Sequence, residues 1–356
     1  MQLLQDTIQK IKKPDYSLAQ EAQKRLDNLT KPQGSLGRLE EIAKQMIVVT
    51  GNLRPPLKNK VIFTMAADHG VVTEGVSAFP KEVTPQMVYN FIRGGAAINV
   101  LARHVGAKVI IVDMGVAVDL DKYPGLIIKK VGYGTRNMTE GPAMSKEEAV
   151  ASIEAGIEVF EAEYGKGIDI IGIGDMGIGN TTPSTAIASI LTGKSVEEIA
   201  GRGTGLDDAG LSKKIGVIKK ALKVNVLQPD DGLDVLAKVG GFEIGGLVGV
   251  ILAAAARKVP VVIDGFISTA AALIAYTLKP DVKEYMVAAH CSQEKGHRLM
   301  LAYLELKPLL DLNMRLGEGT GAALGMSIIE ASIKILTEMA TFQSAGVSER
   351  MDKENF

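Results

Sequence analysis

The 356-residue sequence has one cysteine, no tryptophan and few other aromatic residues, and its charges nearly cancel. A single cysteine, Cys291, excludes an internal disulfide framework and is typical of a reducing compartment. A net charge of -1 provides no field that would attract nucleic acid or an anionic membrane, and the scarcity of aromatic side chains argues against a base-stacking surface. We therefore expect no nucleic-acid partner.

Long hydrophobic segments are missing as well. The longest apolar run, 245–256, ends at a basic pair and is too short to span a bilayer. Residues 1–13 alternate polar and apolar positions without the continuous apolar core of a signal peptide. These observations predict a cytoplasmic protein with no membrane partner.

Six short runs rich in β-branched residues predict buried strands, and most are separated by stretches with a helical pattern. The strands are expected at 61–67, 109–114, 126–131, 168–173, 259–263 and 285–289, and helices at 85–105, 146–164, 211–222 and 242–258. This alternation implies right-handed crossovers. We expect an α/β, Rossmann-like fold with a largely parallel six-stranded sheet and helices on both faces. Residues 59–306 would form this body, and 1–58 with 307–356 a small helical subdomain that carries the loop around residue 318.

Polar and glycine residues follow five of the expected strands. Because ligands of such sheets bind outside the carboxyl ends of the strands, we expect the site there. One acid or glycine after a strand is usually turn chemistry, so the prediction depends on the five segments together. The segments are 68–70, 113–115, 174–177, 264–265 and 290–292, and they make Asp264 and Ser292 candidates.

The segment 172–185 is a glycine-rich run between an expected strand and an expected helix. Thr182 suits the N-cap of that helix and Pro183 its first position. Glycines before a helix N-terminus let main-chain amides surround an anion, so the segment predicts a phosphate-binding turn. Its candidate residues are Asp175, Gly177, Gly179 and Asn180.

The spacing of Gly172, Gly174 and Gly177 also matches the dinucleotide fingerprint. That fingerprint requires the helix to open within the glycines and an acidic residue about 20 positions on, at the end of a second strand. Here the helix is expected after Asn180, and the next acids lie in a polar connection at 197–198. An NAD-dependent oxidoreductase is therefore disfavoured, and a glycine-rich turn without a ligand stays open.

Two more glycine-rich segments precede expected helices. In 315–321, Glu318 lies between glycines, where it is either a favourable charge at a helix N-terminus or a general base on an unhindered turn. Segment 201–208 leads into a helix with Lys213 and Lys214, of which one could reach a phosphate, although paired lysines more often form a solvated face. The segments add the candidates Gly203, Lys214, Leu316 and Glu318.

The histidines do not have the spacing of a metal site. His69 and His290 follow different strands, and one cysteine cannot form a thiolate site. We expect them to be polar lining or core residues, and we assign no metal. Cys291 lacks the context of a catalytic thiol.

The order of these motifs resembles the family of nicotinate-nucleotide:dimethylbenzimidazole phosphoribosyltransferases, enzymes of the late cobamide (vitamin B12) pathway. The matching segments are 29–39, 67–71, 74–77, 172–182, 201–208 and 315–321, so the resemblance covers nearly the whole chain.

The resemblance implies transfer of the phosphoribosyl group of nicotinate mononucleotide to 5,6-dimethylbenzimidazole or a related azole or purine base, giving α-ribazole 5′-phosphate and nicotinate. It implies a homodimer without a cofactor. Glu318 would remove the azole N–H proton while the other ring nitrogen attacks C1′ with inversion. Ser77 and Gln86 would line the benzimidazole pocket, and Gly177, Lys214 and Ser292 would surround the ribose phosphate.

One position departs from the family pattern. The family usually has glutamate where this chain has Asp175, which is one methylene shorter. This departure favours the alternative of a non-catalytic nucleotide-binding module or sensor on the same fold. The intact glycine loop and Glu318 favour an active enzyme.

Overall fold

The computed structural model describes residues 1–348, and contacts divide the chain into two units. The larger unit comprises Met1–Lys13 and Lys58–Met326, and the smaller unit Pro14–Leu57 and the chain from 327 onward. The sequence predicted boundaries at 58/59 and 306/307, whereas here the first 13 residues and the loop of Glu318 belong to the larger unit. Residues 349–356 of the predicted subdomain lie outside the described residues.

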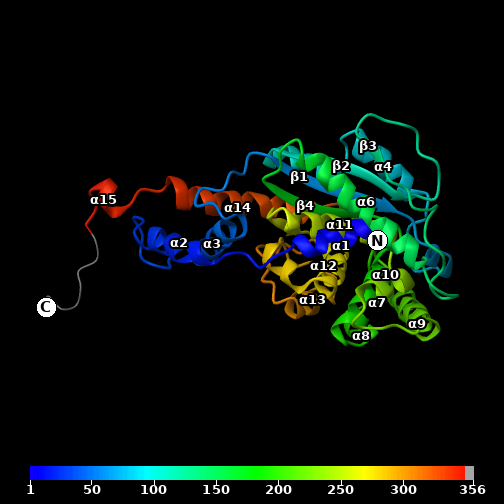
Figure 1. Ribbon diagram of the computed structural model, residues 1–356. Coiled ribbons are helices and arrows are strands. Elements are labelled where there is room, and N and C mark those ends of the chain that lie inside the picture. Colours follow the sequence, from blue (N-terminus) through cyan, green and yellow to red (C-terminus); the bar gives the residue numbers. More distant parts are fainter. Residues whose placement is uncertain (349–356) are drawn as a thin grey trace. The chain divides into compact units, whose positions relative to one another are not determined.

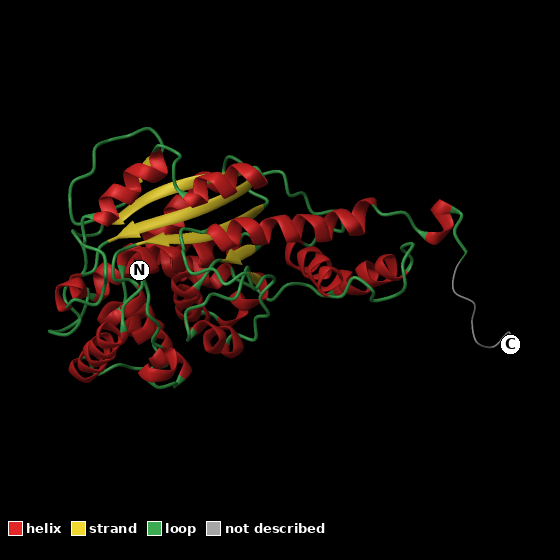
Figure 2. Ribbon diagram, turned by 180° about the vertical axis from the view of Figure 1, so that it is seen from behind, coloured by secondary structure: helices red, strands yellow, loops and turns green. Residues whose placement is uncertain are grey.

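The larger unit contains a six-stranded parallel sheet (Figures 1 and 2). Each predicted strand overlaps one of the six, so the predicted fold is confirmed. The strands are β1 Lys60–Ala67, β2 Ala107–Gly115, β3 Leu126–Ile128, β4 Ile170–Met176, β5 Val261–Ile263 and β6 Met286–Ala288, in the order β3-β2-β1-β4-β5-β6. The order reverses beside β1, which pairs with β2 on one side and with β4 on the other. Such a switch point opens a crevice at the carboxyl ends of the strands.

Helices cover both faces of the sheet, as alternate side chains along β1 show. Ile62 pairs in register with Gly172, and a Cβ on that glycine would contact Ala322 at the start of α14 (Thr320–Glu338). Phe63, the next residue, points to the other face and packs against Phe160 of α6 (Lys146–Tyr164). The sheet therefore has no solvent-facing side at its centre, in agreement with its continuous apolar strands.

The predicted helix at 85–105 is wrong, because the chain forms two helices there. α4 (Val83–Ile92) and α5 (Ala97–Val105) are separated by a glycine pair, and Gly94 has a φ of 76°, which a continuous helix cannot contain. The other helices of the larger unit are α1 Gln2–Lys10, α7 Thr181–Thr192, α8 Val196–Ile199, α9 Asp208–Val224, α10 Gly232–Val239, α11 Phe242–Ala256, α12 Phe266–Leu278 and α13 His297–Tyr303, with 3-10 turns η1 Gly70–Glu74 and η2 Pro280–Tyr285.

The smaller unit is helical, as its sequence pattern predicts. It contains α2 (Ser17–Asp27), α3 (Arg38–Thr50), the second half of α14 and α15 (Phe342–Ala345). Its core includes Leu26, Ile47 and Leu336.

Within the described residues, α14 is the one helix long and apolar enough to cross a membrane by length and composition, yet 56% of its most apolar 18-residue stretch is buried inside the protein. The buried core helices of soluble proteins can have this length and composition as well.

Candidate active site

A cavity of about 450 Å³ lies where the loops after β4, β5 and β6 meet the loop before α14. Several of the sequence-predicted candidates line it, namely Asp175, Gly177, Asn180, Gly203, Ser292, Leu316 and Glu318. The structure thus brings together four segments that are far apart in the chain. All of these residues belong to the larger unit.

The glycines of the β4–α7 segment have two different functions. Strand β4 continues to Met176, so Gly172 and Gly174 are strand residues and not part of a phosphate-binding turn. A Cβ on Gly174 would lie 2.2 Å from the main-chain oxygen of Glu318. These two glycines allow the 317–319 loop and α14 to approach the sheet, and their match to the dinucleotide fingerprint reflects this packing. The prediction is wrong for them, and the turn itself consists of Gly177 to Gly179.

The first turn of α7 begins one residue before the predicted N-cap. The N-cap is Asn180, not Thr182, and Pro183 lies within the helix. Asn180 makes no capping hydrogen bond with its side chain, and its Nδ2 donates to Asp175 Oδ2 at 2.9 Å. Thr181, the first helical residue, lines the cavity, so the positive end of the α7 dipole faces the ligand space.

Glu318 is held in a rare main-chain conformation at the edge of the cavity. Its φ is 63°, and those of Gly317 and Gly319 are also positive, at 86° and 97°. The carboxylate Oε2 accepts a hydrogen bond of 3.2 Å from the main-chain N–H of Ile98, in the first turn of α5. The residue is 5% exposed, and burial raises the pKa of its carboxyl group. A carboxylate with a raised pKa is a better match for accepting a proton near neutral pH.

Two further buried carboxyl groups flank the loop of Glu318. Asp264 does not line the cavity; its Oδ1 accepts from Ala322 N–H at 2.9 Å and its Oδ2 from Gly319 N–H at 3.2 Å, which fixes the first turn of α14. Burial raises the pKa of Asp264 to about 7. Burial, and next the charge of Asp264, raise the pKa of Asp175 well above its ordinary value.

Around Gly203 and Arg315 the lining lies against a buried lysine, and we call this part of the cavity its cationic end, although the carboxyl group of Glu294 also lines it. Lys214 is fully buried behind the lining, and its Nζ donates to Thr181 Oγ1 at 2.7 Å and to the Gly201 oxygen at 3.2 Å. Burial lowers its pKa to about 8, against the opposing charge of Glu294. The prediction of a solvated lysine face therefore does not hold for Lys214. Arg315, which lines the cavity, donates weakly to the Gly203 oxygen at 3.4 Å.

Between these ends the wall of the cavity is apolar. It is formed by Phe79, Val83, Met87, Ile178 and Leu316. Ser77 and Gln86 are not among the lining residues. Ser77 Oγ lies 3.4 Å from the hydroxyl of Thr204, which does line it, and Gln86 lies beside Met87 on α4.

Sequence reasoning missed several residues of the lining, including Phe79, Met87, Glu294 and Arg315. Phe79 and Met87 lie close to the predicted residues Ser77 and Gln86, and Arg315 is the first residue of the glycine-rich segment 315–321. Nothing in the local sequence distinguishes Glu294 from a solvated acid.

The two histidines that were weighed as metal ligands have separate environments. His69 is buried, and its Nε2 lies 2.7 Å from Glu243 Oε1. Burial lowers the pKa of His69, but the charge and hydrogen bond of Glu243 outweigh this effect and raise it. His290 lines the cavity. Within residues 1–348, no group of three or more histidine, cysteine or acidic side chains is arranged to hold a metal ion.

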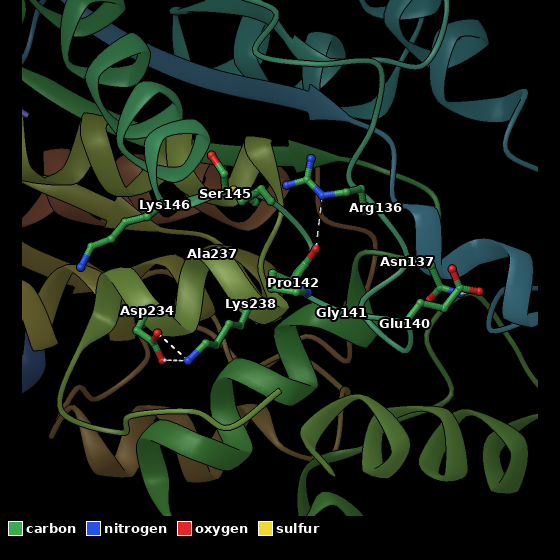
Figure 3. Close-up of a pocket in the computed structure, with 11 residues that line it drawn as sticks. Arg136, Asn137, Glu140, Gly141, Pro142, Ser145, Lys146, Asp234, Ala237 and Lys238 are labelled. Atoms are coloured by element: carbon green, nitrogen blue, oxygen red, sulfur yellow. Dashed lines mark hydrogen bonds and ion pairs between the residues drawn. The ribbon is translucent and has the colours of Figure 1, made fainter. Parts of the chain in front are cut away.

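A second cavity, of about 510 Å³, lies between the loop at 136–146 and α10 (Figure 3). Several of its charged side chains are already paired within the protein. Arg136 binds Glu148 at 2.6 Å, and Lys238 binds Asp234 at 2.6 Å. None of the predicted site residues lines it, so we do not assign the chemistry to this cavity.

A parallel α/β sheet with a helix N-terminus, a buried cation and a carboxylate on an unhindered loop at its switch point is typical of an enzyme that handles phosphorylated sugars or nucleotides. A family model described as phosphoribosyltransferase matches residues 11–347. The chain is 60% identical over 349 residues to the nicotinate-nucleotide–dimethylbenzimidazole phosphoribosyltransferase of Desulforudis audaxviator and 59% identical over 349 residues to that of Geotalea uraniireducens; each alignment covers 98% of this chain and 99% of the relative. A crystal structure of the enzyme of that name from Thermus thermophilus has a TM-score of 0.90 and 44% identity, covering 94% of this chain and all of that one. The chain belongs to this phosphoribosyltransferase family.

Proposed function

We propose that the protein transfers the phosphoribosyl group of nicotinate mononucleotide to 5,6-dimethylbenzimidazole, giving α-ribazole 5′-phosphate and nicotinate. The observation that carries the proposal is the position of Glu318. It is a buried carboxylate with a raised pKa, and it lines a cavity whose other lining residues include apolar side chains and Arg315, with Lys214 bonded to the lining residue Thr181. The relatives named above bear the name of this reaction.

The chemistry requires little beyond positioning and one base. One nitrogen of the azole attacks C1′ from the face opposite the pyridinium, and the C1′–N bond of the pyridinium breaks. Its electron pair returns to the ring nitrogen, so the leaving ring is uncharged at that nitrogen and needs no acid. The other azole nitrogen loses its proton to the Glu318 carboxylate. A positioned base contributes about 10²–10⁴-fold, and orientation supplies much of the rest.

The phosphate would bind at the cationic end. Gly177 and Gly179 precede the N-terminus of α7, whose first residue, Thr181, accepts from the ammonium group of Lys214. Gly203, with a φ of 52°, lies against Thr181, since a Cβ on it would be 2.9 Å from Thr181 Oγ1, and Ser292 also lines the cavity. The helix dipole and one buried positive charge favour an anion there, and burial raises the pKa of Glu294 in the same lining, which reduces its opposing negative charge.

The acceptor base would lie against the apolar wall, with Leu316 beside Glu318. Ser77 and Gln86, which lie next to the lining residues Thr204 and Met87, would contact the acceptor at the border of this wall. Asp175 would contact the nucleotide. Its carboxyl group is oriented by Asn180, and Asp264, a neighbour of Asp175, fixes the Glu318 loop.

The test is release of nicotinate by the purified protein supplied with nicotinate mononucleotide and dimethylbenzimidazole. Formation of α-ribazole 5′-phosphate in equal amount supports the proposal. Saturable binding of the mononucleotide without product would instead favour a non-catalytic sensor on the same fold.

We infer further that the protein is a homodimer in the cytoplasm, as the family resemblance implies. The buried, unpaired Cys291 is compatible with a reducing compartment. Light scattering coupled to gel filtration tests the dimer, because a mass equal to one chain of 37.8 kDa would exclude it.

A further inference from the structure

His297, the first residue of α13, is fully buried and uses both ring nitrogens within the protein. Its Nδ1 accepts a hydrogen bond of 2.8 Å from the main-chain N–H of Ser292. Its Nε2 lies 2.9 Å from Thr269 Oγ1, and that hydroxyl donates to the Gly265 oxygen at 2.7 Å. The histidine therefore connects the loop after β6 with the loop after β5, and both Ser292 and Gly265 line the cavity.

Donor chemistry allows only one tautomer of this imidazole. A main-chain N–H can only donate, so Nδ1 carries the lone pair and Nε2 carries the proton. Thr269 accepts that proton and gives its own to Gly265, so every hydrogen bond in the chain has a fixed direction. The titratable and charged groups that face the ring are His290, whose ring centroid is 6.1 Å away and whose own pKa burial lowers, and the cation Arg298. Burial, and then these two groups, lower the pKa of His297 to about 3, so the ring is neutral throughout the working range.

The main-chain donors around Ser292 are all engaged. The N–H of Cys291 donates to the Leu310 oxygen at 2.7 Å, and that of Gln293 to the Met314 oxygen at 3.0 Å. The N–H of Glu294 donates to Ser292 Oγ at 3.3 Å. Gln293 is exposed and does not line the cavity, so the Ser292 hydroxyl is the donor by which this segment can reach a ligand there. Its Oγ is held from one side by Glu294, and its backbone is held by His297.

We propose that His297 is a positioning residue for the phosphate-binding side of the cavity, where it directs the Ser292 hydroxyl toward the ligand. It touches no substrate atom itself and acts through Ser292 and Gly265. This inference rests on the proposed function, since the phosphate of the mononucleotide is the group that the hydroxyl would bind.

The sharpest perturbation is Thr269→Val, which keeps the shape of the side chain and leaves the proton on His297 Nε2 without an acceptor. We expect the KM for nicotinate mononucleotide to rise about tenfold with little change in kcat. Thr269→Ser keeps the hydroxyl group and should have the wild-type KM for nicotinate mononucleotide. Thr277→Val is the matched control, because Thr277 lies on the same helix and makes the same kind of bond, to the Leu273 oxygen at 2.9 Å, without a histidine.

A double-mutant cycle separates positioning from general loss of structure. If His297 acts through the Ser292 hydroxyl, Thr269→Val in a Ser292→Ala background should change KM by less than about twofold. Fully additive effects, or equal effects of Thr269→Val and Thr277→Val, would overturn the inference.

The tautomer is checked without any activity. The sequence has four histidines, so ¹⁵N spectra of the ring nitrogens are assignable by single substitution. His297 should carry its proton on Nε2 and should not titrate between about pH 5 and pH 9. A proton on Nδ1, or titration in that range, contradicts the proposal. If the wild-type protein releases no nicotinate, the proposed function fails, while this spectrum still decides the state of His297.

Discussion

The most direct prediction concerns Glu318→Gln, which removes the base and preserves the geometry around it. The amide oxygen of glutamine can still accept the hydrogen bond from Ile98 N–H, now 3.2 Å long. The side-chain volume is nearly unchanged, and the left-handed backbone at this position treats the two residues alike. The variant therefore tests proton removal with little effect on binding.

The expected loss follows from the single role of the group. A positioned general base contributes about 10²–10⁴-fold, or about 2.7–5.4 kcal/mol in the activation free energy. We expect kcat to fall by that factor, with the KM for nicotinate mononucleotide within about threefold of the wild-type value. The wild-type rate should rise with pH through the raised pKa of Glu318, and this limb should disappear in the variant.

Unfolding of the variant is a testable alternative to loss of the base. The folded pKa of Glu318 lies above its ordinary value of 4.5, so folding favours the protonated form. Stability is therefore lost as pH rises from about 4.5 through the folded pKa, and the neutral glutamine avoids this loss. At pH 8 the variant should melt at or above the wild-type temperature. A stable variant that retains more than about a tenth of wild-type turnover would remove Glu318 from the mechanism.

The remaining predictions concern the surroundings of this base. Asp175→Glu extends the carboxyl group by one methylene into the cavity and should leave kcat/KM within about tenfold of wild type, since the chemical group and its place in the lining are kept. A complete loss of activity would show that the shorter side chain is required. Gly174→Ala places a Cβ 2.2 Å from a main-chain atom and should lower the free energy of unfolding by about 1–3 kcal/mol or more, measured by thermal unfolding. Gly216→Ala on α9 has open space around it and should raise the free energy of unfolding by about 0.5–1 kcal/mol. Lys214→Met should weaken mononucleotide binding, measured by calorimetry, by about 10–150-fold. The affinity of the wild-type protein should fall as pH rises through about 8, where this lysine loses its proton. An unchanged affinity in the variant would exclude a role for the charge of Lys214.

Much of the fold could be predicted from local sequence. The strands are continuous apolar runs because both faces of the sheet are covered, and each of the six was located from its β-branched content. Helix α6 was predicted with its observed bounds, since Ser145 and Glu148 form a capping box that fixes its start. Such signals are encoded within a few residues of the element itself.

The site was predicted less completely, because its chemistry depends on contacts distant in sequence. Gly174 looks like a turn glycine, and only the approach of Glu318, far along the chain, shows that it is there for close packing. Thr182 was predicted as the N-cap because it precedes Pro183, whereas the helix begins after Asn180, whose side chain binds Asp175. Glu294 and His297 have no local signature, since their importance comes from the loops that they join.

The positive φ of Glu318 has a consequence for attempts to make the protein more heat-resistant. A non-glycine residue in the left-handed region costs roughly 1 kcal/mol, and glycine or asparagine at the same place relieves that cost. Selection for thermal tolerance alone would therefore accept replacements at position 318 and discard the proton acceptor. Engineering for durability should hold this position constant and seek its gains elsewhere in the chain.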